Sequence, residues 1–167
     1  TGGTGPQYQL TSQGAGLFPS FAAASGPCAC DAPVCAPDAV EREIEPDCGL
    51  PIDTVNGGCN STPFAVEHIS LNERLRGTAA FDGDTRDTDW YAFTLAAPAT
   101  ITARVRAEFD ARLALLPDDY CASFSTLDSL FISPCATGEI TIALPAGTYY
   151  VFVSPSFLAP VACGSSY

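Results

Sequence analysis

The feature that most constrains the fold is a series of short apolar segments that alternate like β-strands and are separated by turn residues. Six segments rich in β-branched and aromatic residues are 64–69, 88–95, 100–106, 112–116, 139–144 and 148–153. In the third segment one face carries Ile101, Ala103 and Val105. The residues between them, which we expect to face solvent, are Thr102, Arg104 and Arg106.

No stretch of the chain keeps an apolar stripe at helical spacing between a cap and a stop. The pattern therefore predicts an all-β fold, an antiparallel β-sandwich with an extended N-terminal arm. Residues 145–147, Pro-Ala-Gly, are expected to form a tight turn that pairs segment 139–144 with segment 148–153.

Composition limits the class of protein. The 167 residues are 47% hydrophobic, enough for one compact domain. Lysine is absent and the net charge is -12, so nucleic acid would be repelled. No apolar run approaches the roughly 20 residues that span a bilayer. A chain numbered from Thr1 fits an exported protein from which the signal has been removed.

Eight cysteines in a chain without methionine indicate an oxidising compartment, extracellular or at the cell surface. We expect all of them to form disulfides: Cys28, Cys30, Cys35, Cys48, Cys59, Cys121, Cys135 and Cys163. The connectivity cannot be read from the sequence, but Cys48–Cys59 and Cys121–Cys135 would close short loops and are the preferred pairs. Cys163 would then reach one of the first three.

A zinc site is the alternative use of these cysteines. Cys28, Cys30 and Cys35 lie close together, and His68, the only histidine, could complete four ligands. The paired C-x-x-C motifs of structural zinc sites are missing, however, so disulfides are the favoured interpretation.

The chain divides by composition into three parts. Residues 1–26 are rich in Gly, Ser and Ala and form the N-terminal arm, whereas residues 27–62 are a connector rich in Cys and Pro. Residues 63–167 contain the predicted strands and form the sandwich.

Several motifs resemble one known family. They are GDTRDTDWYAFTL at 83–95, LALL at 113–116, LPAGTYYVFV at 144–153, EIEPD at 43–47 and DTVNGGCN at 53–60. Residues 41–167 are similar to the bacterial pre-peptidase C-terminal domain, in a cysteine-bearing variant found in secreted proteins. The resemblance implies a jelly-roll-like β-sandwich that serves exported proteins as a non-catalytic appendage for secretion, attachment or substrate binding. It implies no catalytic residues.

The chain departs from this family at both ends. Residues 1–40 have no counterpart, and the family's last strand, which should follow a Gly-x-x-Tyr motif such as 164–167, is absent because the chain stops. A sandwich without an edge strand leaves backbone donors and acceptors unpaired. The arm segment QYQLT at 7–11 alternates like a strand and resembles the Tyr-x-Leu-Thr strand that the family places after this tyrosine.

These observations predict a donor strand near residues 7–12, with Tyr8, Leu10 and Tyr167 as subunit contacts. If the arm of one copy completes the sheet of the next, the contact is head-to-tail and generates a filament of identical subunits. Two alternatives stay open: the arm folds back on its own domain, or the chain is one unit of a tandem array.

Four acidic residues form a candidate calcium site on one loop: Asp82, Asp84, Asp87 and Asp89. Some domains of the resembled family bind calcium near this motif. Asp-Gly and Asp-Thr pairs also simply make turns, and the spacing is not that of an EF-hand loop. We expect no cofactor to be required.

No catalytic constellation stands out, and we expect no enzyme activity. His68 lies in an alternating segment without a nucleophile motif nearby. The alternative to a filament subunit is an accessory module that binds polysaccharide or a cell surface. Its sugar-stacking platform would use Trp90, Tyr149, Tyr150 and Phe152, although such aromatics more often fill a sandwich core.

Overall fold

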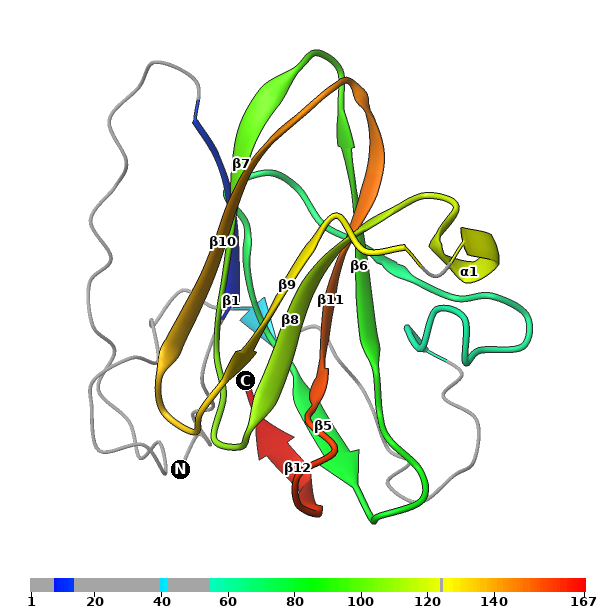
Figure 1. Ribbon diagram of the computed structural model, residues 1–167, viewed down its shortest axis with the longest axis vertical. Coiled ribbons are helices and arrows are strands. Elements are labelled where there is room, and N and C mark those ends of the chain that lie inside the picture. The colour runs from blue at the N-terminus through cyan, green and yellow to red at the C-terminus, as the bar shows by residue number, and fades with distance from the viewer. Residues whose placement is uncertain (1–7, 14–39, 42–54, 124) are drawn as a thin grey trace.

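A computed structural model of the chain describes residues 8–13, 40–41, 55–123 and 125–167. Two five-stranded sheets form the two layers of the fold, and a two-stranded ribbon lies at one end (Figure 1). The all-β sandwich predicted from the sequence is therefore confirmed. Within the described ranges no helix has the length and apolar character to cross a membrane.

The first sheet is named here the β7 sheet. Its strands, in spatial order, are β10 (Thr137–Leu144), β7 (Ala99–Arg106), β1 (Tyr8–Gln13), β4 (Arg74–Arg76) and β2 (Val40–Glu41). All neighbours are antiparallel except β2, which runs parallel to β4.

The second sheet is named the β11 sheet. Its strands, in order, are β3 (Glu67–His68), β6 (Asp89–Leu95), β11 (Gly147–Pro155), β8 (Ala111–Pro117) and β9 (Asp128–Ile132). Here β3 runs parallel to β6, and the other neighbours are antiparallel. The short helix α1 (Tyr120–Ser123) lies between β8 and β9 in the chain, and the separate ribbon pairs β12 (Val161–Ser166) with β5 (Thr78–Phe81).

The main core lies between the two sheets, as the alternation predicted. Ile101, Ala103 and Val105 on β7 are fully buried, and they belong to one cluster with Val151 and Val153 on β11. Burial of these apolar side chains is the main favourable contribution to folding.

The predicted hairpin across residues 145–147 is wrong. β10 pairs with β7, whereas β11 pairs with β6 and β8, so the chain passes from one sheet to the other at this point. The alternation of a strand determines which of its residues face the core. It does not determine which sheet the strand joins, since both sheets cover the same core.

The expectation that Thr102 and Arg106 face solvent is also wrong, because both side chains are buried. β7 is an interior strand, and the Thr102 Oγ1 lies 2.9 Å from the Oγ1 of Thr141, its neighbour on β10. Arg104 is more exposed and forms an ion pair with Glu139 on β10.

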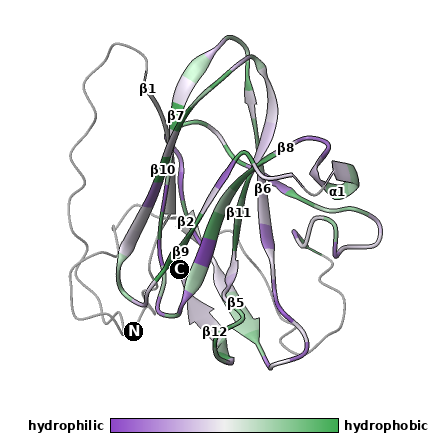
Figure 2. Cartoon of the chain, viewed as in Figure 1, coloured by the Kyte–Doolittle hydropathy of each residue, from purple (hydrophilic) through white to green (hydrophobic). Residues whose placement is uncertain are grey.

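A second hydrophobic cluster covers the outer face of the β11 sheet. It consists of Trp90, Ala114, Leu116 and Phe152, with Val66, Tyr120 and Tyr150 packed against them. Figure 2 shows hydrophobic stretches along β8 and β11, the paired strands in the middle of this sheet. This sheet is therefore buried on both faces, which a single alternating pattern does not predict.

Candidate functional site

The strand β1 occupies an interior position in the β7 sheet. It pairs with β7 over five residues, from Gln9 opposite Arg104 to Gln13 opposite Thr100, and with β4 through Tyr8 and Gln9. The strand position between β4 and β7 is named here the β1 slot. Without β1, the edges of β4 and β7 would lose their backbone partners, because these two strands do not pair with each other.

The residues that flank the β1 slot belong to the main core. Ile101, Ala103 and Val105 on β7 and Leu75 on β4 are each 1% exposed or less. In the ladder Leu10 is opposite Ala103 and Tyr8 is opposite Leu75. The β1 slot thus lies in the part of the β7 sheet that covers the main core.

Tyr167, directly after β12, is fully buried. Its backbone N–H donates to the carbonyl oxygen of Gly77 at 3.0 Å, and its own carbonyl oxygen accepts from the Gly77 N–H at 3.1 Å. Its phenol oxygen lies 2.6 Å from that of Tyr91, and its ring packs edge-on against Phe109. Tyr167 is therefore held by both its backbone and its side chain.

β12 and β1 lie end to end along one continuous stretch of the chain, residues 74–81, in which Gly77 joins β4 to β5. Tyr8 is opposite Leu75, and Gly77, two residues further along this stretch, is hydrogen-bonded to Tyr167. Tyr167 thus lies two ladder positions before Tyr8, and only the position opposite Arg76 separates them.

The neighbour on the other side gives the same offset. Gln9 is opposite Arg104, and the N–H of Glu108, four residues further along, donates to the carbonyl oxygen of Ser166 at 3.0 Å. β12 and β1 therefore follow one another in the same direction, with one ladder position between Tyr167 and Tyr8, and the C-terminus lies close to one end of β1 (Figure 1).

The structure brings the three predicted contact residues into this one arrangement. Tyr8 and Leu10 are in β1, and Tyr167 comes directly after β12. Within the chain, β1 pairs with the chain's own β4 and β7, which is the fold-back arrangement that the sequence left open.

Both preferred disulfides are wrong. Cys59 is bonded to Cys121, with 5.6 Å between their Cα atoms, which excludes Cys48–Cys59 and Cys121–Cys135. Cys135 and Cys163 are disulfide-bonded as well, so none of the four described cysteines is free. The other four, Cys28, Cys30, Cys35 and Cys48, lie outside the described residues, as does the cysteine part of the alternative zinc site.

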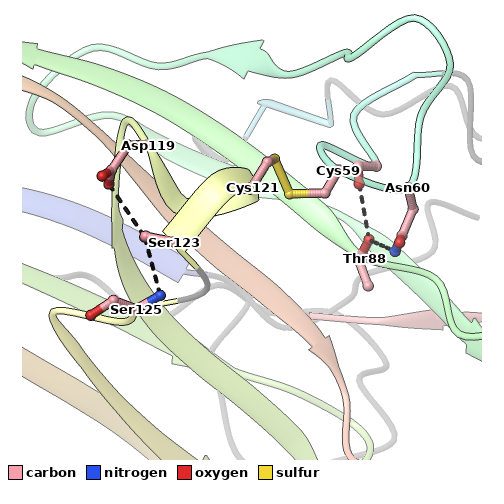
Figure 3. The surroundings of a disulfide bond; sticks show 8 residues. Cys59, Asn60, Thr88, Asp119, Cys121, Ser123 and Ser125 are labelled. Carbon is pink, nitrogen blue, oxygen red and sulfur yellow. Dashed lines mark hydrogen bonds between the residues drawn. A yellow bond between two sulfur atoms is a disulfide. The ribbon is translucent and has the colours of Figure 1, made fainter.

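The Cys59–Cys121 disulfide is shown in Figure 3. The two segments that it joins both pack against Trp90. On one side the backbone at Gly58 packs so closely that a Cβ there would lie 2.2 Å from the indole, and its φ of 56° also favours glycine. On the other side lies Tyr120, next to Cys121, and the centre of its ring is 5.4 Å from the centre of the Trp90 ring. The disulfide therefore stabilises the cover of the second cluster.

Hydrogen bonds hold the first of these segments to β6. The Asn60 Nδ2 donates to the Thr88 Oγ1 at 2.9 Å, and that hydroxyl lies 3.3 Å from the carbonyl oxygen of Gly57 (Figure 3). The N–H of Trp90 donates to the carbonyl oxygen of Asn56 at 2.9 Å. The segment thus follows the start of β6 closely.

The four aspartates of the candidate calcium site are not gathered by the structure. The Asp82 Oδ1 accepts from the N–H groups of Thr85 and Asp84, and these hydrogen bonds, Thr85 first, lower the pKa of that carboxyl. Asp84 is exposed, whereas Asp89 is buried on β6. The described residues contain no group of three or more acidic, histidine or cysteine side chains suited to a metal ion. Calcium stays a prediction from the sequence.

The predicted aromatic platform is not an exposed surface. Trp90, Phe152 and Tyr149 are buried, and Tyr149 packs in the main core on the other face of the sheet. Only Tyr150 is partly exposed, and its pKa is raised by burial and then by the negative charge of Asp118. Core packing, the favoured interpretation of these aromatics, is confirmed for the three buried rings.

His68 is exposed on β3, a short strand beside β6. The sequence did not predict that large apolar side chains would be exposed, and those above half exposure are Phe131, Phe157 and Leu158. The guanidinium carbon of Arg86 lies 3.9 Å from the centre of the Phe157 ring. A cation over an aromatic face is a favourable surface interaction, and no period-two pattern indicates it.

Comparison with known proteins gives no match to a family model, to a curated protein or to a solved structure. The resemblance of residues 41–167 to the pre-peptidase C-terminal domain therefore stays a prediction from the sequence motifs.

Proposed function

We propose that this protein is a non-catalytic structural subunit of an extracellular filament, in which the β1 strand of each copy fills the β1 slot of the next. One observation carries the proposal. A strand from the N-terminal arm lies in the interior of the β7 sheet, although the long segment 14–39 separates it from the next described residues of the chain.

Exchange of β1 between copies would preserve its backbone contacts. The ladder of β1 with β4 and β7 consists of main-chain pairs, and these are the same whether the strand comes from its own chain or from an identical one. The segment 14–39 could reach about 90 Å when fully extended, which is ample for a neighbouring domain.

The geometry of such a contact favours a filament. The donor is the N-terminal arm and the acceptor is the β4–β7 edge, which are different surfaces of the chain. A contact between two different surfaces is head-to-tail, so it continues from copy to copy unless the rotation closes a ring.

The disulfides support an extracellular location, and the charge favours assembly through a specific contact. Cys59, Cys121, Cys135 and Cys163 are all disulfide-bonded, and such bonds persist mainly outside the reducing cytosol. A net charge of -12 without any lysine keeps free subunits apart at long range, which makes a specific strand contact the means of assembly.

A cysteine pair across the slot distinguishes exchange from fold-back. Gln9 and Arg104 are directly opposite in the ladder, so Q9C with R104C would bring two Cα atoms within disulfide range, about 4.5–5.5 Å. We expect oxidation to give a ladder of covalent multimers on a non-reducing denaturing gel, and long threads in electron micrographs of the same sample.

A matched control is Q9C with T141C, because Thr141 lies on β10, one strand beyond β7 and about 10 Å from β1. This pair should not close, and the native disulfides should be unchanged. The proposal fails if Q9C with R104C forms only cross-links within single chains and no threads are seen.

A further inference from the structure

β12 and β1 lie end to end, and this arrangement determines where a strand donated by another copy would begin. Tyr167 and Tyr8 are two ladder positions apart on both neighbouring strands, and β12 and β1 run in the same direction. We infer that the β1 slot continues the line of β12, and the path formed by β12 and the slot is named here the β12 track. A segment with the sequence of 7–13 attached directly after Tyr167 takes the slot in place of β1.

The register makes this inference specific. A residue attached to Tyr167 would lie opposite Arg76, and the next would lie opposite Leu75, where Tyr8 lies now. The sequence QYQLTSQ of residues 7–13 would thus follow Tyr167 without a spacer, and its last six residues would take the ladder positions that residues 8–13 have now. One extra residue would shift the pairing by one position and reverse the faces of the whole strand.

The end of the track is rigidly defined. Tyr167 is buried, it is paired with Gly77 through two backbone hydrogen bonds, and its phenol oxygen meets that of Tyr91. On its other side Ser166 accepts from the N–H of Glu108, and its own N–H donates to the Glu108 Oε2 at 3.2 Å. A segment that follows Tyr167 therefore starts from a fixed point and a fixed direction.

The inference rests on the proposed function only in its last step. In an assembly, residue 7 of the donor copy would lie next to Tyr167 of the acceptor copy, and the two chains would form one continuous track along β4, β5 and β7. Tyr167 would then mark where each donor strand begins and set its register.

The first test moves the strand. A variant that lacks residues 1–13 and carries QYQLTSQ directly after Tyr167 should fold as a monomer at all concentrations, with a Tm within about 4 °C of that of the full chain. The control variant has one glycine between Tyr167 and the moved strand, and its Tm should be lower by roughly 10 °C or more. Equal Tm values for the two variants, or a less stable direct fusion, would overturn the inference.

The second test keeps the full chain and adds QYQLTSQ after Tyr167, so that two identical strands compete for one slot. The added strand has no linker, whereas β1 is tethered through 14–39, so its effective concentration at the slot is higher. We expect hydrogen exchange to protect the added copy by at least tenfold over the N-terminal copy, and we expect threads to be lost. Protection of the N-terminal copy instead would overturn the inference.

These outcomes separate the two claims. If the unmodified chain forms no threads, the proposed filament fails, but the moved strand can still stabilise its own slot. If threads form and the directly fused variant does not fold better than its glycine control, the filament stands and the shared track fails.

Discussion

The two sheets of the sandwich are assembled in different ways. In the β11 sheet, β6, β8, β9 and β11 all come from residues 89–155, and the disulfide Cys59–Cys121 lies over its outer face. In the β7 sheet, the interior strand β1 comes from the N-terminal arm, and β4 and β2 are joined to the rest of the sheet only through it. One sheet is thus built locally and cross-linked, whereas the other depends on a distant segment.

This difference suggests that the two sheets have different roles. The β11 sheet buries side chains on both faces, in the main core and in the second cluster, so opening it would expose two sets of apolar side chains. The β1 strand joins the β7 sheet through backbone ladders to β4 and β7. A strand held in this way can be supplied by another chain without rearrangement of the core.

The largest expected effect is that of removing β1. Deletion of residues 1–13 removes the ladder that joins β4 to β7, and at about 1 kcal/mol for each net backbone hydrogen bond we expect a loss of roughly 5 kcal/mol. Denaturant unfolding would measure this loss, and electron microscopy should show no threads.

The matched control deletes residues 1–6 and leaves β1 intact. It should keep both the unfolding midpoint and the threads. If the two deletions behave alike, the β7 sheet does not depend on its distant strand and the comparison between the sheets is wrong.

A somewhat smaller effect is expected from Trp90→Ala in the β11 sheet. Trp90 is 2% exposed and packs against the rings of Phe152, Tyr150 and Tyr120, so its truncation should lower the free energy of unfolding by about 3–5 kcal/mol. Phe131→Ala, at 68% exposure on β9, is the control and should change it by less than about 0.5 kcal/mol. Because Trp90 lies in the other sheet from β1, filament formation should survive below the lowered Tm.

Replacing both Cys59 and Cys121 by serine tests the cross-link itself. We expect a loss of about 2–4 kcal/mol, because the bond closes a loop with a sequence separation of 62. Thermal unfolding of this variant beside the unmodified chain would measure it. Threads should still form at room temperature, and their disappearance would mean that the cross-linked cover contributes to assembly as well as to stability.

Much of the fold could be predicted from local sequence. The alternation of Ile101, Ala103 and Val105 correctly identified the core face of β7, because a strand buried on one side repeats every second residue. The same rule indicated a strand in segment 7–11, where the structure has β1. Burial on both faces, as at Trp90 and Thr102, follows from neighbours that the local pattern does not contain.

What could not be predicted depends on pairs that are far apart in the chain. Cys59 pairs with Cys121 across a long loop, whereas short loops were preferred because their closure needs less ordering of the chain. The common track of β12 and β1 is a matter of ladder register, and it emerges only from the pairings of Gly77 and Glu108. Alternation in the sequence thus predicts which face of a strand is buried, whereas the strand and disulfide partners follow only from tertiary contacts.

The smallest expected effect is that of replacing Asp82 in the turn between β5 and β6. This turn connects the ribbon of β5 and β12 to the cross-linked β11 sheet. The pKa of Asp82 lies below its ordinary value of 3.8 because backbone N–H groups of Thr85 and Asp84 donate to its carboxylate. A lowered folded-state pKa stabilises the fold above about pH 4 and loses this contribution as the pH falls through that lowered value. Asp82→Ala should therefore lower the Tm slightly at neutral pH, and the difference between the two Tm values should shrink as the pH falls below 3.8. Melting curves of both proteins, each with excess chelator and with millimolar calcium, would measure this difference. If calcium raises the Tm of the unmodified protein but not that of Asp82→Ala, the turn binds an ion. The hydrogen bonds of Asp82 alone would then not account for its contribution to stability.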